Sequence, residues 1–289
     1  MNSEKIMILK LDSKSVFMKY ISSEVIENIY VIRISSFGFF MKLLRKIKLD
    51  FCIYGSWKKR LKQIDNIIIF DNGYNCSITK YIKKKNPECK IIFYYWNIIN
   101  SHNNLALYDS NIDEVWTFDK ADAKRYDLKY NPQFYSKKVI LEEKKIENDI
   151  LFLGRDKNRK KTILELEKIC LSKKIKTNFI VVKNERNLLS YQEYLDLLGN
   201  SRCILDILSK NQKGMTIRVM EALFLNKKLI TNNQDIVNYD FYCKENIFVL
   251  GKDNLDDLEK FIKSNYKKIP DDIINNYNYE SWLKRFYRK

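Results

Sequence analysis

NQKGMTIRVMEAL, residues 211–223, follows a short apolar run at Cys203–Ile207 and opens a helix-like stretch. Strand, polar loop with a glycine, then helix is the unit from which open parallel sheets are built. The start of such a helix leaves backbone N–H groups unpaired, and Arg218 follows within its first turn. These groups suit phosphates, while Glu221 suits a pair of sugar hydroxyls. The stretch predicts a pocket for a ligand that carries both a diphosphate and a sugar.

The same alternation of short apolar runs and amphipathic stretches occurs twice along the chain. It predicts parallel sheets wrapped by helices, because right-handed crossovers bury both faces of a sheet. The expected strands are Ile6–Leu11, Tyr30–Ile34, Ile67–Asp71, Lys90–Tyr95, Glu114–Phe118, Ile150–Leu153, Asn178–Val182, Cys203–Ile207, Lys228–Thr231 and Asn246–Leu250. The expected helices are Ser13–Glu27, Phe39–Lys48, Cys76–Lys85, Asp119–Tyr126, Lys160–Ser172, Leu188–Leu198, Thr216–Asn226 and Leu255–Tyr266.

The segment 136–148 is charged and has no sustained period, which predicts a linker. The sequence thus predicts an α/β protein with one doubly wound domain at residues 1–145 and another at residues 146–270. A basic, aromatic tail at residues 271–289 is expected to pack back on the first domain. Because ligands of open α/β sheets bind beyond the carboxyl ends of the strands, we expect the site in a cleft that both domains face.

Composition excludes several classes of protein. With 289 residues, 45% apolar and 13% aromatic, the chain can bury two cores and is not disordered. Its apolar runs have strand length, so no bilayer-spanning helix is expected, and the polar start predicts no signal peptide and an intracellular protein. Six scattered cysteines without a C-x-x-C pair predict reduced thiols instead of disulfides or a zinc site.

The charge predicts an anionic partner. Lys and Arg number 53 against 36 Asp and Glu, a formal net charge of +17. Nucleic acid, an acidic membrane leaflet and a phosphorylated acceptor all fit this charge. The segment Ser36–Arg60 interleaves aromatic with basic residues, which is typical of a helix on an anionic membrane, and equally of a core-facing helix with a basic outer side. Since no nucleic-acid-binding motif occurs, nucleic acid is not expected as a partner.

A second basic cluster follows the predicted strand Ile150–Leu153, where a glycine ends the strand and cations crowd the next turn. Such cations would neutralise a leaving diphosphate. The alternatives without a ligand are a solvated lysine-rich turn after Gly154 and a surface ion pair between Arg218 and Glu221. The predicted donor-binding residues are Gly154, Arg155, Lys157, Arg159, Lys213, Gly214, Met215, Thr216, Arg218 and Glu221.

Three residues at or just after the ends of predicted strands in the first half are alternatives for a general base: Asp71, Asp12 and His102. Each could equally be a loop-capping residue. The chain has one histidine and no Asp-x-Asp pair, so no metal site is expected. It also lacks the Gly-x-Gly-x-x-Gly and P-loop motifs, so a bound dinucleotide or nucleotide cofactor is not expected.

The block Ile204–Asn233, together with Asp113–Asp119 and Tyr94–Asn97, resembles bacterial GT-B glycosyltransferases of surface-polysaccharide assembly. The nearest likeness is to lipopolysaccharide core biosynthesis proteins of the rhamnosyltransferase type. The resemblance implies two Rossmann-like domains that face a central cleft, with the nucleotide-sugar donor in the C-terminal domain and the acceptor in the N-terminal one.

The resemblance also implies roles for individual residues. Glu221 matches the glutamate that holds the donor ribose, and Gly214, Thr216 and Arg218 lie where the diphosphate sits. Many retaining members carry a second glutamate eight positions earlier, where this chain has Lys213. The stereochemical outcome of the reaction is therefore left open.

The resulting expectation is a metal-independent glycosyltransferase without a cofactor, cytoplasmic and peripheral on the inner face of the cell membrane. It would move a sugar from a nucleoside diphosphate, with dTDP-rhamnose preferred, to a lipid-linked or lipopolysaccharide core acceptor. One alternative is a transferase that builds capsule, O-antigen or teichoic acid from a UDP-sugar. The other is a non-catalytic basic protein that binds nucleic acid or membrane.

Overall fold

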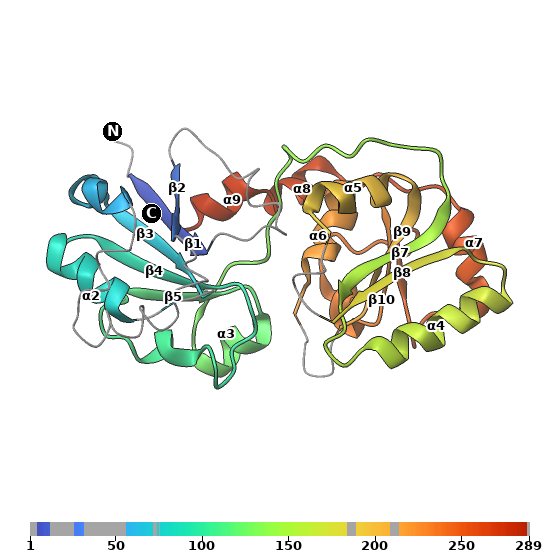
Figure 1. The fold of residues 1–289 in the computed structure, drawn as a ribbon, viewed down its shortest axis with the longest axis horizontal. Coiled ribbons are helices and arrows are strands. Elements are labelled where there is room, and N and C mark those ends of the chain that lie inside the picture. The colour runs from blue at the N-terminus through green and yellow to red at the C-terminus, as the bar shows by residue number, and fades with distance from the viewer. Residues whose placement is uncertain are drawn as a thin grey trace. The chain divides into compact units, whose positions relative to one another are not determined.

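The computed structural model describes residues 5–11, 26–31, 56–71, 74, 76–183, 189–208 and 214–287. These residues form two compact units (Figure 1): one holds the described residues up to Pro132 together with Tyr287, and the other holds Gln133 to Phe286. Each unit contains one sheet whose strands pair in parallel. The predicted α/β class with two Rossmann-like sheets is therefore confirmed.

The sheet of the first unit has six strands in the order β2-β1-β3-β4-β5-β6. The order reverses at β1, which pairs with β2 on one side and with β3 on the other. Its strands are β1 (Ile6–Leu11), β2 (Ile26–Val31), β3 (Asn66–Phe70), β4 (Lys90–Tyr95), β5 (Glu114–Thr117) and β6 (Lys129–Tyr130).

The central strands of this sheet are buried on both faces, as their sequences predict. All five residues of β3 (NIIIF) are buried, and so are the last five of β4 (KIIFYY). β-Branched and aromatic side chains fill such strands, and helices cover them. The covering elements are the helices α2 (Cys76–Lys85) and α3 (Lys120–Tyr126) and the 3₁₀ helices η3 (Ser56–Gln63) and η4 (Asn104–Tyr108).

The sheet of the second unit has five strands in the order β11-β10-β9-β7-β8. Here the order reverses at β7, which pairs with β8 on one side and with β9 on the other. A reversal of this kind is the point where open α/β sheets bind ligands. The strands are β7 (Asn148–Arg155), β8 (Thr177–Val182), β9 (Ser201–Asp206), β10 (Lys228–Thr231) and β11 (Ile247–Val249).

Helices cover both faces of the second sheet (Figure 1). α4 (Lys160–Ser172) and α7 (Leu258–Lys263) bury their apolar stripes in one core cluster with Phe152 of β7 and Leu205 of β9. Because side chains alternate along a strand, Leu153 and Asp206 point to the opposite face. The helices of that face are α5 (Tyr191–Gly199) and α6 (Ile217–Phe224). The remaining elements are η6 (Gln234–Asn238), η7 (Leu255–Asp257), α8 (Asp271–Asn276) and α9 (Tyr279–Lys284).

Some predicted boundaries are wrong. Ile26 and Glu27 were expected in a helix but belong to β2, which ends at Val31. The helix expected to reach Tyr266 ends at Lys263, and the ammonium of Lys228 donates to the Phe261 carbonyl in its last turn. The rest of the expected helix Ser13–Glu27, the helix Phe39–Lys48 and residues 36–55 of the basic segment lie outside the described residues.

The predicted linker 136–148 lies within the second unit. It runs alongside the end of α5, where the Lys144 N–H donates to the Gly199 carbonyl over 3.1 Å and the Glu147 N–H to the Asn200 carbonyl over 2.9 Å. These hydrogen bonds join backbone atoms and need no periodic pattern of apolar side chains. The sequence of this segment therefore looks like that of a free linker. The structure divides the two units after Pro132, whereas the sequence predicts the boundary at residue 145.

The C-terminal tail, expected on the first domain, is grouped with the second unit as far as Phe286. The backbone of Tyr135 is bonded on both sides to this tail, at Tyr277 over 3.0 Å and at Tyr279 over 2.9 Å. Next to it the rings of Phe134 and Trp282 lie 4.2 Å apart between centroids. The tail therefore packs on the segment that opens the second unit.

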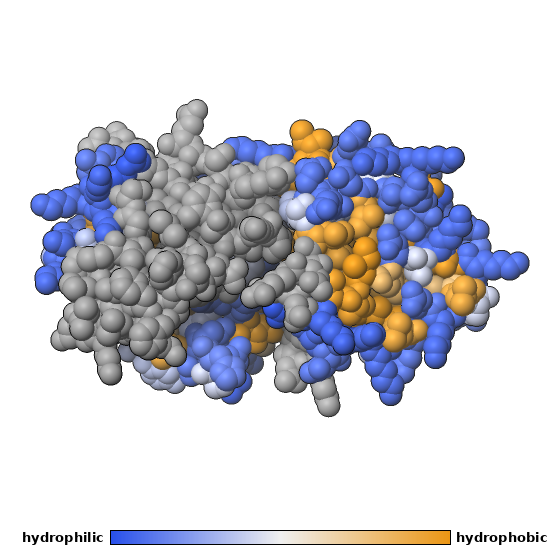
Figure 2. Space-filling view, in the orientation of Figure 1, coloured by the Kyte–Doolittle hydropathy of each residue, from blue (hydrophilic) through white to orange (hydrophobic). Residues whose placement is uncertain are grey.

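None of the described helices combines the length and the apolar character that a membrane span needs. Hydrophilic side chains cover much of the described surface in Figure 2, and an apolar area lies on the second unit. The five described cysteines are unpaired.

Candidate functional site

The reversal point of the second sheet gathers charged side chains. β7 ends at Arg155 and β9 at Asp206, so the carboxyl ends of two neighbouring strands carry opposite charges. Arg218, in the first turn of α6, reaches both strands: its Nη2 donates to the Leu153 carbonyl over 2.6 Å, and its Nη1 lies 3.6 Å from Asp206 Oδ1. We describe Arg159, Arg218 and Asp206 below as the arginine cluster.

Asp206 is fully buried and holds three elements together. It accepts a hydrogen bond from Thr216 Oγ1 over 2.9 Å and one from Thr231 Oγ1 over 3.4 Å. Burial raises the pKa of this carboxyl, and the nearby charge of Arg218 and the Thr216 bond oppose that rise. Asp206 is thus a buried carboxylate whose hydrogen bonds come chiefly from hydroxyls, so Arg218 is bound to it only loosely.

Two guanidinium groups lie against one aromatic ring. Arg159 and Arg218 each have their guanidinium carbon 5.0 Å from the centroid of Phe152. Arg159 is buried and donates through Nη1 to the Ile207 carbonyl over 2.5 Å. Stacking on an aromatic face and bonding to carbonyls fixes both planar groups in place without neutralising their charge.

The charges of the arginine cluster do not balance. Burial, and next the positive charge of Arg218, lower the pKa of Arg159 to about 10. That value still leaves Arg159 protonated at neutral pH. Two guanidiniums therefore face one carboxylate, and each guanidinium has five N–H donors of which carbonyl oxygens take only a part. An excess of fixed donors and of positive charge is the condition for binding an anion.

Gly154 makes this approach of the two arginines possible. A Cβ atom at this position would lie 2.4 Å from Nη2 of Arg218 and 2.9 Å from Nη2 of Arg159. Both amino groups therefore occupy the space above the glycine. The predicted importance of a glycine at this strand end has a specific cause, the close passage of two side chains.

The start of α6 has the predicted geometry in part. Thr216 is its N-cap, and its Oγ1 accepts from the Arg218 N–H over 3.2 Å. Gly214 is buried, and the Met215 side chain is 2% exposed, so that side chain belongs to the core. Lys213 lies outside the described residues.

Glu221 lies near enough to Arg218 for the charge of that guanidinium to lower its pKa, but its hydrogen bonds come from tyrosines. Its carboxylate is buried and accepts from the Tyr194 hydroxyl over 2.8 Å and from Tyr191. The hydroxyl of Tyr191 is bonded in turn to that of Tyr135. Burial raises the pKa of Glu221, and the Tyr194 bond opposes the rise. In the free protein Glu221 thus anchors α6 to α5 through tyrosines.

Arg155 and Lys157, two further predicted cations, lie on the turn after β7. Arg155 is half-buried and Lys157 is exposed. Lys157 and Asn158 both have left-handed backbone, with φ of 43° and 62°. This turn folds the chain back so that Arg159, two residues later, enters the arginine cluster. The structure therefore gathers Arg159 and not the exposed Lys157.

Asn233, which follows β10, adds an unused donor near the cluster. Its N–H donates to Thr231 Oγ1 over 3.1 Å, and its Oδ1 accepts from the Asp235 N–H over 3.1 Å. These bonds fix the amide, while its Nδ2 is buried without an acceptor in the part of the chain that the structure describes. An orphaned donor of this kind gains a partner when a ligand oxygen arrives.

The three predicted bases of the first unit have different settings. Asp71 follows β3 directly, is 8% exposed, and has its pKa raised to about 6 by burial against the opposing bonds of Asn97 and Trp96. His102 is exposed in a turn, where its N–H donates to Asn100 Oδ1 over 2.8 Å. Asp12 lies outside the described residues. A carboxyl with a pKa of about 6 can exchange a proton near neutral pH, and the role of Asp71 as a base stays a prediction.

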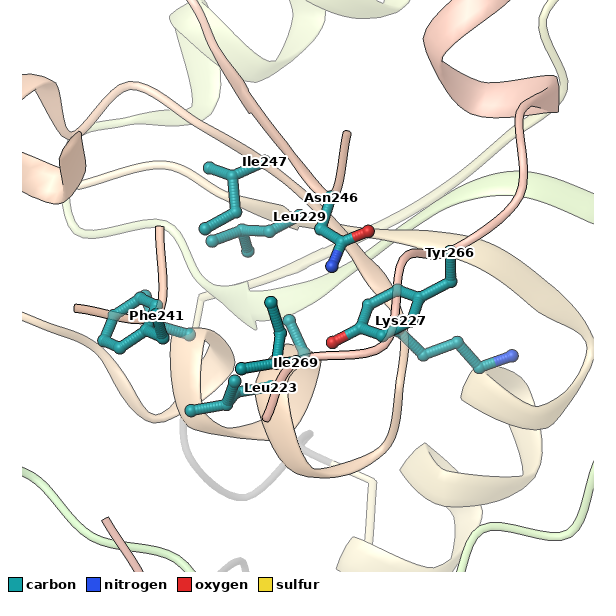
Figure 3. A pocket seen from close by; sticks show the side chains of 10 residues that line it. Leu223, Lys227, Leu229, Phe241, Asn246, Ile247, Tyr266 and Ile269 are labelled. Carbon is teal, nitrogen blue, oxygen red and sulfur yellow. The ribbon is translucent and has the colours of Figure 1, made fainter. Parts of the chain in front are cut away.

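A separate cavity of about 20 Å³ lies between α6, β10, β11 and residues 266–269 (Figure 3). Leu223, Phe241 and Ile269 line it. Two of its polar lining residues are bonded elsewhere: Lys227 to the Ser201 carbonyl and Asn246 to Lys267. The arginine cluster is not part of its wall. It is a packing defect of the core.

Comparison with known proteins gives no family: no family model matches the chain, and no curated protein does. Within the described ranges no three His, Cys, Asp or Glu side chains are placed to hold a metal ion.

Sequence reasoning missed two members of these networks. Asp206 was taken as part of an apolar strand, although an acid inside the run CILDIL was itself a signal, because carboxylates are seldom fully buried without partners. Tyr194 lies on the helical stripe of α5 and is indistinguishable from a core residue until its neighbour Glu221 is seen.

Proposed function

We propose that this protein is a metal-independent glycosyltransferase of the GT-B type that uses a nucleoside-diphosphate sugar. The observation that carries the proposal is the arginine cluster: two fixed guanidiniums against one carboxylate, at the reversal point of a parallel sheet and beside the start of a helix. A diphosphate supplies the missing negative charge there.

In this proposal the cluster acts on the leaving group. As the bond between sugar and diphosphate breaks, negative charge grows on the diphosphate, and Arg159 and Arg218 stabilise it without reorganising, since Phe152 and backbone carbonyls already hold them. The Nδ2 of Asn233 would donate a hydrogen bond to a neutral oxygen next to the phosphates. Glu221 is proposed for the ribose hydroxyls, a role for which the Tyr194 hydroxyl competes.

The other half of the reaction is proposed for the first unit. Asp71 would take the proton of the acceptor hydroxyl as that oxygen attacks the sugar carbon. Its raised pKa, about 6, leaves it ionised at neutral pH and yet basic enough to accept a proton. The reaction rate should then rise with pH through about 6.

The proposed acceptor is a lipopolysaccharide core or another surface glycan, and dTDP-rhamnose is the preferred donor. The net charge of +17 supports attachment to an anionic membrane surface on the cytoplasmic side. This part of the proposal rests on resemblance and charge, whereas the donor site rests on geometry.

Titration calorimetry with UDP and dTDP tests the donor site. We expect Arg218→Ala and Arg159→Ala each to weaken binding roughly tenfold or more, as loss of a charged hydrogen bond does. Arg202→Ala is the matched control, because Arg202 is an exposed arginine at the opposite end of β9, paired with Asp149 at 3.4 Å. Equal affinity in all four proteins, with folding intact, would rule out the site.

A salt titration separates the enzyme from a non-catalytic basic protein. Tight binding to DNA or to anionic vesicles with a steep salt dependence, and no nucleotide affinity, would favour the second alternative. Mass spectrometry of nucleotide-sugars that copurify with native protein would then name the base and the sugar.

A further inference from the structure

Two buried carboxylates lie beyond the carboxyl ends of the first sheet. Asp71 follows β3, and Asp122 lies in the first turn of α3; they are 8% and 5% exposed. The loop after β4 bonds to both: the Asn97 N–H donates to Asp71 Oδ2 over 3.2 Å, and the Ile99 N–H to Asp122 Oδ2 over 2.8 Å. In the described chain no lysine or arginine lies within salt-bridge distance of either carboxylate. Both keep capacity to accept hydrogen bonds.

A tyrosine hydroxyl without a partner belongs to the same place. Tyr95 is the last residue of β4, next to the strand that Asp71 follows. Its side chain is fully buried, and its hydroxyl has no hydrogen-bond partner among the described residues. β3 and β4 pair with Phe70 opposite Tyr94, so Asp71 lies beside Tyr95, and Asp122 is bonded to the loop that follows Tyr95. Burial raises the pKa of Tyr95, and the charges of Asp71 and Asp122 add to the rise.

The three groups together restrict the chemistry of a ligand. The hydroxyl of Tyr95 has a proton to donate and needs an oxygen that accepts it. The carboxylates of Asp71 and Asp122 need a donor. An ammonium group has no acceptor, a carbonyl has no donor, and a phosphate would meet two uncompensated carboxylates. An alcohol hydroxyl satisfies both requirements, since it accepts from the tyrosine and donates to a carboxylate.

We propose that Tyr95, Asp71 and Asp122 form a binding site for an alcohol hydroxyl of the ligand, in which Tyr95 is the donor that fixes the hydroxyl oxygen. The proposal rests on the proposed function where it identifies this hydroxyl with that of the acceptor. Tyr95 would then orient the oxygen, with a lone pair directed away from the tyrosine, while Asp71 takes its proton.

The neighbouring surface suits the ring that carries such a hydroxyl. Tyr108 is 78% exposed and Leu105 54% exposed, both on η4. Tyr108 is among the neighbouring groups that raise the pKa of Tyr95. Exposed aromatic and apolar side chains beside polar groups present a flat surface to the apolar face of a sugar ring. The ligand class is therefore a pyranoside with a free hydroxyl.

Tyr95→Phe removes only the orphaned hydroxyl and is the deciding variant. We expect its melting temperature to equal or exceed that of the wild type, because an unsatisfied buried group is lost. Tyr74→Phe is the matched control: Tyr74 packs on the same core, but its hydroxyl donates to Asp109, so this variant should melt lower.

Binding is measured by saturation-transfer NMR with methyl α-L-rhamnopyranoside and methyl α-D-glucopyranoside, in the presence of UDP. We expect Tyr95→Phe to weaken the bound pyranoside roughly threefold to tenfold and Tyr74→Phe to leave it unchanged.

Three results would overturn the proposal. If neither pyranoside binds to the wild type, the proposed ligand class is wrong. Equal binding to the wild type and to Tyr95→Phe means that the hydroxyl meets a trapped water only. A Tyr95→Phe variant that melts as low as Tyr74→Phe reveals a partner within the protein. Failure of the donor site shows separately, as unchanged UDP affinity in Arg218→Ala.

Discussion

Arg218 passes so close to Gly154 that a Cβ atom there would lie 2.4 Å from its Nη2. The same Cβ would lie 2.9 Å from Nη2 of Arg159. The atoms that would clash are the far ends of two long side chains and not backbone atoms. A methyl group at this position would therefore displace the guanidiniums and leave the sheet intact.

Gly154→Ala should accordingly separate stability from binding. We expect a change of less than about 1 kcal/mol in the free energy of unfolding and a loss of roughly tenfold in affinity for UDP. Urea unfolding and calorimetry measure the two quantities. Gly251→Ala is the contrasting control, since Gly251 has φ of +84° in a turn, and a side chain there costs stability without approaching the arginine cluster. Full UDP affinity in Gly154→Ala would contradict the role of the cluster.

Asp71 makes stability depend on pH in a definite direction. Its pKa is raised from roughly 4 in an unfolded chain to about 6 in the folded protein. Between these values the folded state binds more protons than the unfolded state, so stability falls as pH rises through this window. A shift of this size corresponds to about 3 kcal/mol. Asp71→Asn should lack this loss, and unfolding at pH 4 and pH 7 compares the two proteins. An identical pH slope would show that Asp71 is not shifted.

The sequence predicted the bounds of strands better than features that depend on contacts between distant residues. β4 and β10 have the predicted bounds, because both are compact apolar runs that begin with a lysine. The two-residue strand β6 is too short to carry an apolar run, and the last turn of α7 is bonded to Lys228, more than thirty residues away. The local sequence pattern contains the bounds of apolar strands, but it does not contain contacts between distant residues.

The same distinction applies to the site. The glycine at 154 and the cations at 159 and 218 follow from strand-end positions, which alternation and turn residues reveal. That Arg159 enters the cluster while Lys157 stays exposed depends on two left-handed residues in one turn. The binding of Glu221 by tyrosines from α5 depends on how two helices pack, which the spacing of residues along α6 does not contain.

Tyr194→Phe should destabilise the protein through Glu221. The variant leaves a buried carboxylate with one donor fewer, which costs roughly 1–3 kcal/mol when the group is charged. Because burial raises the pKa of Glu221, acid protonates it readily, and a neutral carboxyl needs the bond less. The cost should thus be smaller at pH 5 than at pH 8. A double-mutant cycle with Glu221→Gln tests the partnership, and purely additive losses would deny it.

Thr216 connects the helix start to the buried acid, and its hydroxyl has two bonds to lose. It accepts from the Arg218 N–H over 3.2 Å as the N-cap of α6 and donates to Asp206 over 2.9 Å. Thr216→Ala should cost about 1–2 kcal/mol of unfolding free energy through the cap alone. It should also weaken UDP binding, since Asp206 then draws Arg218 closer to replace the lost donor. Thr216→Ser keeps the hydroxyl and should restore both stability and affinity. If serine restores stability but not affinity, the threonine methyl and not the hydroxyl positions Arg218.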